Sequence, residues 1–141
     1  MSHPSLRNGL GALVSLALLT GCPTVDLGAP PVSPGACRPA PAYFADVLWP
    51  ELLASDDVAV SCVGQPACHR IEDGRSALRL STDPVDLDRN YDIATRFLDC
   101  GSPENSALLT KPLSGIDPHG GDDLFAPGSP EEALFLDWFI P

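Results

Sequence analysis

The sequence predicts a small, mostly α-helical domain with long irregular connections. Apolar residues recur at helical spacing over residues 42–54, and Ser129, Pro130 and Glu132 form a strong helix-start signal. The 141 residues also include 16 prolines and 12 glycines, so much of the backbone is expected to be irregular. No internal repeat is visible, and a chain of this length is expected to form one domain.

The first helix is predicted over residues 42–54, because its apolar residues fall on one face. Pro50 cannot donate a backbone hydrogen bond. It therefore predicts either a kink or the first position of a second short helix after Trp49. The residues of the apolar face are Phe44, Val47, Leu48, Leu52 and Leu53.

Shorter elements are predicted in the middle of the chain. Residues 77–80 form a short extended segment, residues 91–98 a second helix, and residues 106–109 a single helical turn that Pro112 ends. The apolar face of the second helix is Ile93, Ala94, Phe97 and Leu98.

Alternating polar residues precede the predicted second helix, as in a calcium-binding loop. Tyr91 and Phe97 stand where such a loop requires glycine and glutamate, so a solvated helix start is expected instead. The alternating residues are Asp86, Asp88, Asn90 and Asp92.

The final helix is predicted to begin at Pro130, with Ser129 as its N-cap and Glu132 as the partner that completes a capping box. Its buried stripe is predicted to be Leu134, Phe135, Trp138 and Phe139.

The N-terminal segment has the features of an export signal. Arg7 precedes an apolar run of about ten residues, which is too short to span a bilayer. The run ends in Leu19-Thr20-Gly21-Cys22, which resembles the lipobox of bacterial lipoproteins. The resemblance implies that residues 1–21 are a signal peptide and that Cys22 is lipidated. It also implies a membrane anchor in an oxidising compartment.

Removal of residues 1–21 leaves 120 residues with a net charge of −12. Such an acidic chain argues against binding to nucleic acid or to an anionic lipid surface, since both need basic patches. Residues 22–42 contain six prolines and are expected to form a tether to a domain over residues 43–141. Pro23, where aspartate would favour inner-membrane retention, favours the outer membrane, on its periplasmic or cell-surface face.

Chemistry is expected around two cysteines and a histidine. Five residues separate Cys62 from Cys68, and His69 follows directly. Further features occur in a fixed order over residues 43–141: Tyr43-Phe44, Trp49-Pro50, Ala77-Leu78-Arg79-Leu80, Gly101-Ser102-Pro103-Glu104-Asn105-Ser106, His119-Gly120-Gly121 and Leu136-Asp137-Trp138. Together they resemble the cytochrome-c-like domain of planctomycete and myxobacterial exported proteins, although c-type cytochromes usually have two residues between the cysteines.

The resemblance implies that Cys62 and Cys68 attach haem c and that His69 is the first axial ligand of the iron. His119 is the one other histidine after the signal peptide, so either it supplies the sixth ligand or that position is open. The implied function is one-electron transfer to or from a redox partner protein. No enzymatic turnover is expected.

A haem-free domain of the same fold is the alternative, acting as a binding or structural lipoprotein module. After lipidation of Cys22, four cysteines remain, an even number that is typical of two disulfides in an exported protein. The pairs would be Cys62–Cys68 with Cys37–Cys100, or Cys62–Cys100 with Cys37–Cys68. A tetrahedral zinc site of Cys62, Cys68, His69 and Cys100 is a third possibility.

Overall fold

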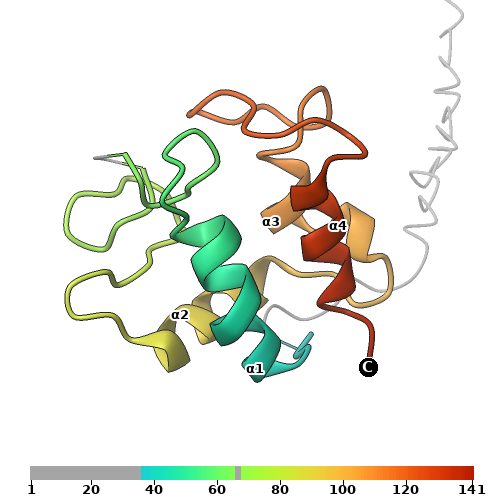
Figure 1. Cartoon of the computed structure of the whole chain (residues 1–141), viewed down its shortest axis with the longest axis horizontal. Helices are drawn as coiled ribbons and strands as arrows, with labels where there is room; N and C mark the ends of the chain where they lie inside the picture. Colours follow the sequence, from blue (N-terminus) through green and yellow to red (C-terminus); the bar gives the residue numbers. More distant parts are fainter. Residues whose placement is uncertain (1–35, 66–67) are drawn as a thin grey trace, which may run out of the picture. The chain divides into compact units, whose positions relative to one another are not determined.

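The computed structural model describes residues 36–65 and 68–141 (Figure 1). The predicted signal peptide, the lipidation site Cys22 and the first part of the predicted tether lie outside the described residues. Within the described ranges, the elements are helices joined by irregular segments, with no β-strand, which confirms the mostly α-helical prediction. None of these helices has both the length and the apolar character needed to cross a membrane.

The first helix continues through two geometries. α1 (Pro41–Tyr43) is α-helical, and the following Phe44–Leu53 is a π-helix. The wider turns end where the Ala54 N–H donates to the Trp49 carbonyl, five residues earlier (2.8 Å). Pro50 lies inside this helix, so it does not start a second one. The predicted helix is confirmed, and the π geometry explains how it accommodates Pro50, whose ring would clash with a carbonyl in an α-helix.

α2 (Leu87–Ala94) begins four residues before the predicted second helix and continues as the 3₁₀ turn Thr95–Phe97. Asp86 is its N-cap and accepts a hydrogen bond from the Arg89 N–H (3.0 Å), which confirms a helix start at the alternating polar residues. Asn90, however, is fully buried and not solvated. Its side-chain amide accepts from the Ser81 N–H (2.8 Å) and donates to the Ser81 carbonyl (2.9 Å).

The last two α-helices follow the sequence signals closely. α3 (Ala107–Thr110) is the predicted single turn, preceded by the 3₁₀ turn Pro103–Asn105. α4 (Pro130–Asp137) starts as predicted, because Ser129 Oγ accepts from the Glu132 N–H (3.3 Å). The Glu132 carboxylate accepts from Gly128 N–H, one residue before the position that a capping box predicts.

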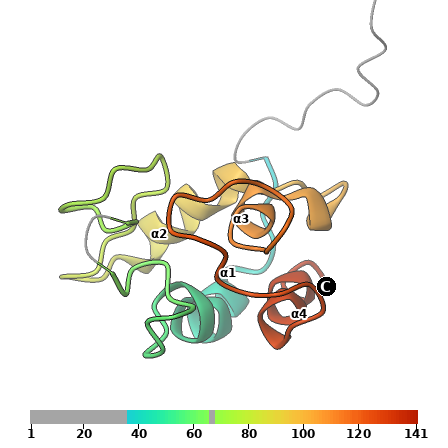
Figure 2. The ribbon, with the colours of Figure 1, turned by 90° about the horizontal axis from the view of Figure 1, so that it is seen from above.

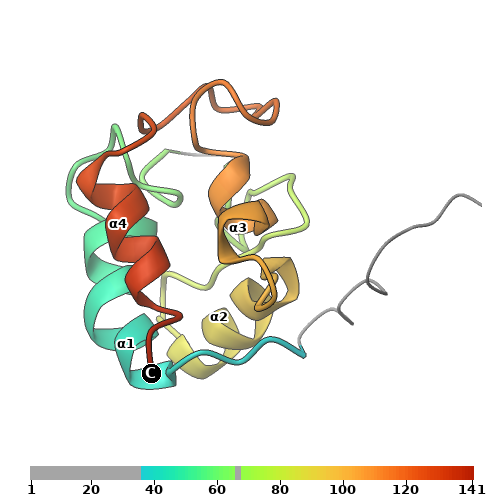
Figure 3. The same cartoon turned by 90° about the vertical axis from the view of Figure 1, so that its right-hand side faces the viewer.

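Aromatic side chains from three helices form the centre of the core. The Phe44 ring lies 5.7 Å from Tyr91 and 5.6 Å from Trp138, and Trp138 lies 6.3 Å from Phe135. Figures 2 and 3 show α4 alongside the first helix, and this packing buries Phe135 and Trp138 almost completely. Leu134, also predicted in the buried stripe, is half-buried, as is Phe139.

The packed part of the chain reaches back to residue 37, within the predicted tether. Cys37 is buried and forms a disulfide with Cys100. The Tyr91 hydroxyl donates to the carbonyl of residue 39 (2.7 Å), and the Trp138 indole donates to that of residue 40 (2.9 Å). Residues 37–40 are therefore fixed against the core.

Two loops are closed by isolated parallel bridges, between Arg70 and Leu80 and between Leu113 and Phe125. Leu80 is the one residue of the predicted extended segment 77–80 that forms such a bridge. The loop between Leu113 and Phe125 lies at the end of the fold away from the C-terminus (Figures 1 and 3). The loop closed by Leu113 and Phe125 carries His119, and the loop closed by Arg70 and Leu80 begins directly after His69.

Candidate functional site

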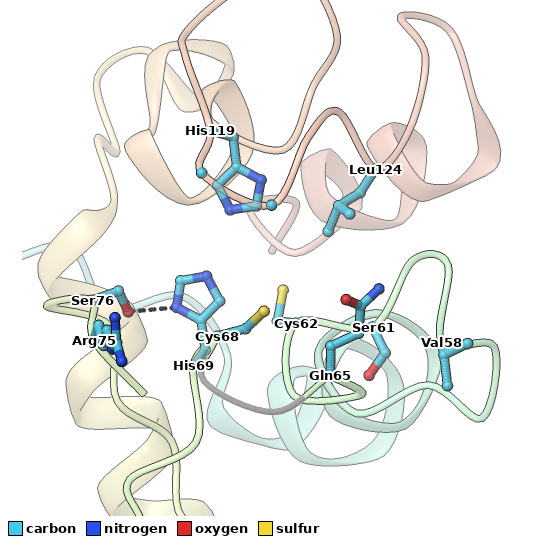
Figure 4. Close-up of a pocket in the computed structure, with 12 residues that line it drawn as sticks. Val58, Ser61, Cys62, Gln65, Cys68, His69, Arg75, Ser76, His119 and Leu124 are labelled. Atoms are coloured by element: carbon cyan, nitrogen blue, oxygen red, sulfur yellow. Dashed lines mark hydrogen bonds between the residues drawn. The ribbon is translucent and has the colours of Figure 1, made fainter. Parts of the chain in front are cut away.

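Four of the residues predicted to carry chemistry lie around one cavity. Cys62, Cys68, His69 and His119 all line a cavity of about 290 Å³ (Figure 4). The first three belong to the segment that follows the first helix, and His119 reaches the cavity from the loop between the Leu113 and Phe125 bridge residues. Residues more than 50 positions apart in the sequence therefore meet at this site.

His69 is held by a hydrogen bond to its backbone carbonyl and by two hydrogen-bond acceptors that lie near its ring nitrogen Nδ1. The Leu80 N–H donates to the His69 carbonyl (2.7 Å), which places the start of the loop beside its end. The His69 Nδ1 lies 3.0 Å from the Leu78 carbonyl and 2.6 Å from Ser76 Oγ. The Ser76 hydroxyl in turn donates to the Leu78 carbonyl (2.6 Å). Its oxygen is therefore free to accept from the His69 Nδ1–H.

The loop that follows His69 depends on a glycine and on an arginine. At Gly74 a Cβ atom would lie 2.3 Å from the Arg70 carbonyl, so no other residue fits this turn without displacing the backbone. The Arg70 side chain donates from Nε to the Val63 carbonyl (2.8 Å). This bond ties the His69 loop to the segment that carries Cys62.

His119 is fixed by a backbone carbonyl in the same way as His69. Its Nδ1 lies 2.8 Å from the Asp122 carbonyl, and the Asp122 N–H returns a bond to the His119 carbonyl (3.2 Å). Asp122 has a φ of 62°, in the left-handed region that aspartate tolerates better than most residues. Thr110 on α3 anchors the loop by donating to the Asp117 carboxylate (2.7 Å).

The two imidazole rings are nearly parallel, with 7° between their planes and 5.9 Å between their centres. Figure 4 shows both rings nearly face-on, with the His119 ring above the His69 ring. Because carbonyl oxygens only accept hydrogen bonds, each Nδ1 carries the proton of the neutral ring and each Nε2 has a free lone pair. The Nε2 edge of His69 points toward His119.

Burial keeps His69 neutral. Desolvation is the largest effect and lowers the pKa of His69; the Leu78 hydrogen bond opposes it, and the nearby His119 adds a smaller lowering effect. A neutral imidazole is the form that binds metals.

Two thiols complete the site. Cys62 and Cys68 are both free, while Cys37 pairs with Cys100. The predicted alternative of Cys62–Cys100 with Cys37–Cys68 is therefore wrong, and the zinc site that included Cys100 loses one of its ligands. Burial raises the pKa of Cys62 to about 12, with a further contribution from Cys68. Cys62 is thus a protonated thiol at neutral pH and not a thiolate.

A second cavity of about 150 Å³ adjoins the first and shares four lining residues with it, among them both histidines. Its remaining wall is mostly apolar and comes from the loop after His69, from the 3₁₀ turn after α2, and from α3 with the two residues that follow it. The residues that contribute it are Ala77, Leu78, Phe97, Ala107, Leu108, Lys111 and Pro112.

Metal-binding side chains are present at the site as one pair of histidines and one pair of thiols. Over residues 36–65 and 68–141, no three histidine, cysteine or carboxylate side chains are grouped closely enough to hold one. His69 and His119 can still bind a metal that brings its other ligands with it.

Comparison of the chain with protein-family models, with curated protein sequences and with solved structures finds no match. The chemistry of the site therefore rests on the geometry of its own residues.

Sequence analysis did not find the groups that orient the histidines. The carbonyls of Leu78 and Asp122 belong to the backbone and leave no signal in the sequence. Ser76 is an ordinary loop serine by sequence, and its contact with His69 depends on the turn at Gly74.

Proposed function

We propose that this protein is an exported lipoprotein whose helical domain, of cytochrome-c-like type, binds haem c and carries single electrons. Cys62 and Cys68 would form the thioether bonds to the porphyrin, and His69 and His119 would be the axial ligands of the iron. The observation that carries this proposal is the pair of parallel imidazoles beside two free thiols, each ring held at Nδ1 by a backbone carbonyl.

The spacing of the two rings fits ligation of one ion from opposite sides. With metal–nitrogen bonds of about 2 Å, and a ring nitrogen about 1 Å from the ring centre, two such rings have centres roughly 6 Å apart. The observed separation is 5.9 Å, and the ring planes differ by 7°. The bond from Nδ1–H to a carbonyl is also the usual outer contact of a metal-binding histidine, because it fixes the ring and raises its basicity.

The composition of the cavity supports a porphyrin over a bare ion. A porphyrin supplies four nitrogen ligands, so His69 and His119 would suffice as protein ligands of its metal. Covalent attachment would add the S–H of each free thiol across a vinyl group, so that the sulfur binds one carbon and the proton the other. When bound, haem supplies reversible one-electron chemistry.

The chain's own residues would set the redox behaviour. Ligation by two histidines gives a lower potential than ligation by histidine and methionine. The Leu78 and Ser76 contacts hold the His69 ring in one orientation, and the burial of that ring limits water at the site. Because the whole chain has a net charge of −11, a basic surface is expected on its redox partner.

The haem-free alternative requires a Cys62–Cys68 disulfide in addition to Cys37–Cys100. Cys62 and Cys68 are free thiols, and no observation on the described residues favours this alternative.

The test is the intact mass and visible spectrum of the full chain, produced in a bacterial periplasm with haem-maturation enzymes. We expect a mass increase of one haem and a Soret band that survives acid-acetone extraction. The Cys62→Ala/Cys68→Ala variant should lose its colour in that extraction, and His119→Ala should keep the covalent haem but lose the low-spin spectrum of two axial histidines. A colourless protein with two disulfides would contradict the proposal.

A further inference from the structure

This inference rests on the proposed function, because it assumes a bound haem. The positions of the two thiols would then determine the orientation of the porphyrin in the cavity. A haem carries its two vinyl groups on one half of the ring and its two propionate carboxylates on the other half. Cys62 and Cys68 lie on one side of the histidine pair, and Arg75 and Ser76 lie on the opposite side (Figure 4). The propionate half would therefore face the side where Arg75 is found.

The cavity walls contain two cations in an otherwise acidic chain. Arg75 lines the larger cavity, and Lys111, which follows α3, lines the smaller one. Ser76, on the Arg75 side of the histidine pair, lines both cavities, as do Cys62, His69 and His119. Across the described ranges, Arg38 and Asp92 form the one ion pair, so neither Arg75 nor Lys111 is neutralised by a carboxylate of its own chain.

A dianionic ligand needs such cations here. The net charge of −11 repels an anion, and two carboxylates entering a half-enclosed cavity also lose part of their hydration. A guanidinium group can bind a carboxylate through two parallel hydrogen bonds, and an ammonium group acts as a point charge. Both side chains are exposed, so they can reach a carboxylate at the mouth of the cavity.

We propose that Arg75 and Lys111 bind the two propionate carboxylates and so select a dianionic porphyrin and fix its orientation. The site then recognises the cofactor at three places: thiols at the vinyl half, histidines at the metal, and cations at the carboxylate half.

The test uses reversible binding, so that affinity can be measured. The parent is the full chain with Cys62→Ala and Cys68→Ala, titrated with ferric haem and with ferric haem dimethyl ester, whose carboxylates carry no charge. Dissociation constants are read from the Soret absorbance. We expect the parent to bind haem about tenfold more tightly than the ester, as two exposed ion pairs allow.

Adding Arg75→Gln and Lys111→Gln should weaken haem binding about tenfold and leave ester binding unchanged. Arg96→Gln is the matched control, because Arg96 is exposed and lines neither cavity, and it should leave both affinities unchanged. Far-UV circular dichroism verifies that each variant is folded.

The outcomes separate the two proposals. Equal affinity of the parent for haem and ester, or equal haem affinity of the parent and the Arg75→Gln/Lys111→Gln variant, would overturn the role of the cations and leave the proposed haem site intact. Failure of the parent to bind either porphyrin would overturn the role of the cations, while the proposed function is tested separately by covalent attachment to the unsubstituted chain.

Discussion

Removal of the Cys37–Cys100 disulfide should cost the domain much of its stability. The two residues are 63 positions apart, so the bond closes a long loop in the unfolded chain. The chain-entropy relation for a loop of this length gives about 4 kcal/mol at 25 °C, within the 2–5 kcal/mol typical of native disulfides in small exported domains. Domains of this size are commonly stable by only about 5–15 kcal/mol, so the loss is a large fraction of the total.

The measurement is urea unfolding of the full chain, followed by far-UV circular dichroism. The parent carries Cys62→Ala and Cys68→Ala, so that no other thiol can re-pair, and the variant adds Cys37→Ala and Cys100→Ala. We expect the free energy of unfolding to fall by about 4 kcal/mol. Reductant should lower the stability of the parent by the same amount and leave the variant unchanged, which separates the effect of the bond from that of the lost side chains.

A decrease below about 1 kcal/mol would refute the loop-entropy reasoning. It would mean that residues 37–40 are held without the disulfide, through the hydrogen bonds that Tyr91 and Trp138 donate to their carbonyls, or that the unfolded chain keeps these residues near Cys100.

Two further predictions concern single side chains. Ser76→Ala should raise the reduction potential of the haem-loaded protein, measured by spectroelectrochemistry, because it removes an acceptor that makes His69 more basic; an unchanged potential would contradict this role. Burial raises the pKa of Tyr91, so the folded state favours the neutral hydroxyl. The contribution of this hydroxyl to stability is therefore fully present below about pH 10, the usual tyrosine pKa, and is lost as the pH rises through the folded-state pKa. Tyr91→Phe should therefore cost about 1 kcal/mol at pH 7, through the lost hydrogen bond, and reduce the loss of stability above pH 10 in urea unfolding; an equally steep loss would refute this.

The helices could be predicted where local signals decide the structure. The start of α4 follows from Ser129 and Pro130, which cap and begin a helix whatever the rest of the chain does. The π-helical turns of Phe44–Leu53 could not be predicted, because they depend on how this segment packs as well as on Pro50. Asn90 looked solvated by sequence, yet tertiary structure buries it against the Ser81 backbone.

The identity of the candidate site residues could be predicted better than their arrangement. Cys62, Cys68 and His69 are adjacent or nearly so, and a local motif indicates them. That His119 faces His69 depends on two loops closed by backbone bridges, and such pairings between distant segments leave no periodic pattern in the sequence.

The irregular backbone of this domain has a direct chemical use at the site. Within a helix, the carbonyls of Leu78 and Asp122 would accept hydrogen bonds from N–H groups four residues later. In the two loops they are available to the imidazoles of His69 and His119 instead, and each fixes the proton on Nδ1. Gly74 and the left-handed Asp122 make these turns possible. The abundance of glycine and proline that limits the helices thus allows two histidines, each fixed at Nδ1 by a backbone carbonyl, to face one cavity.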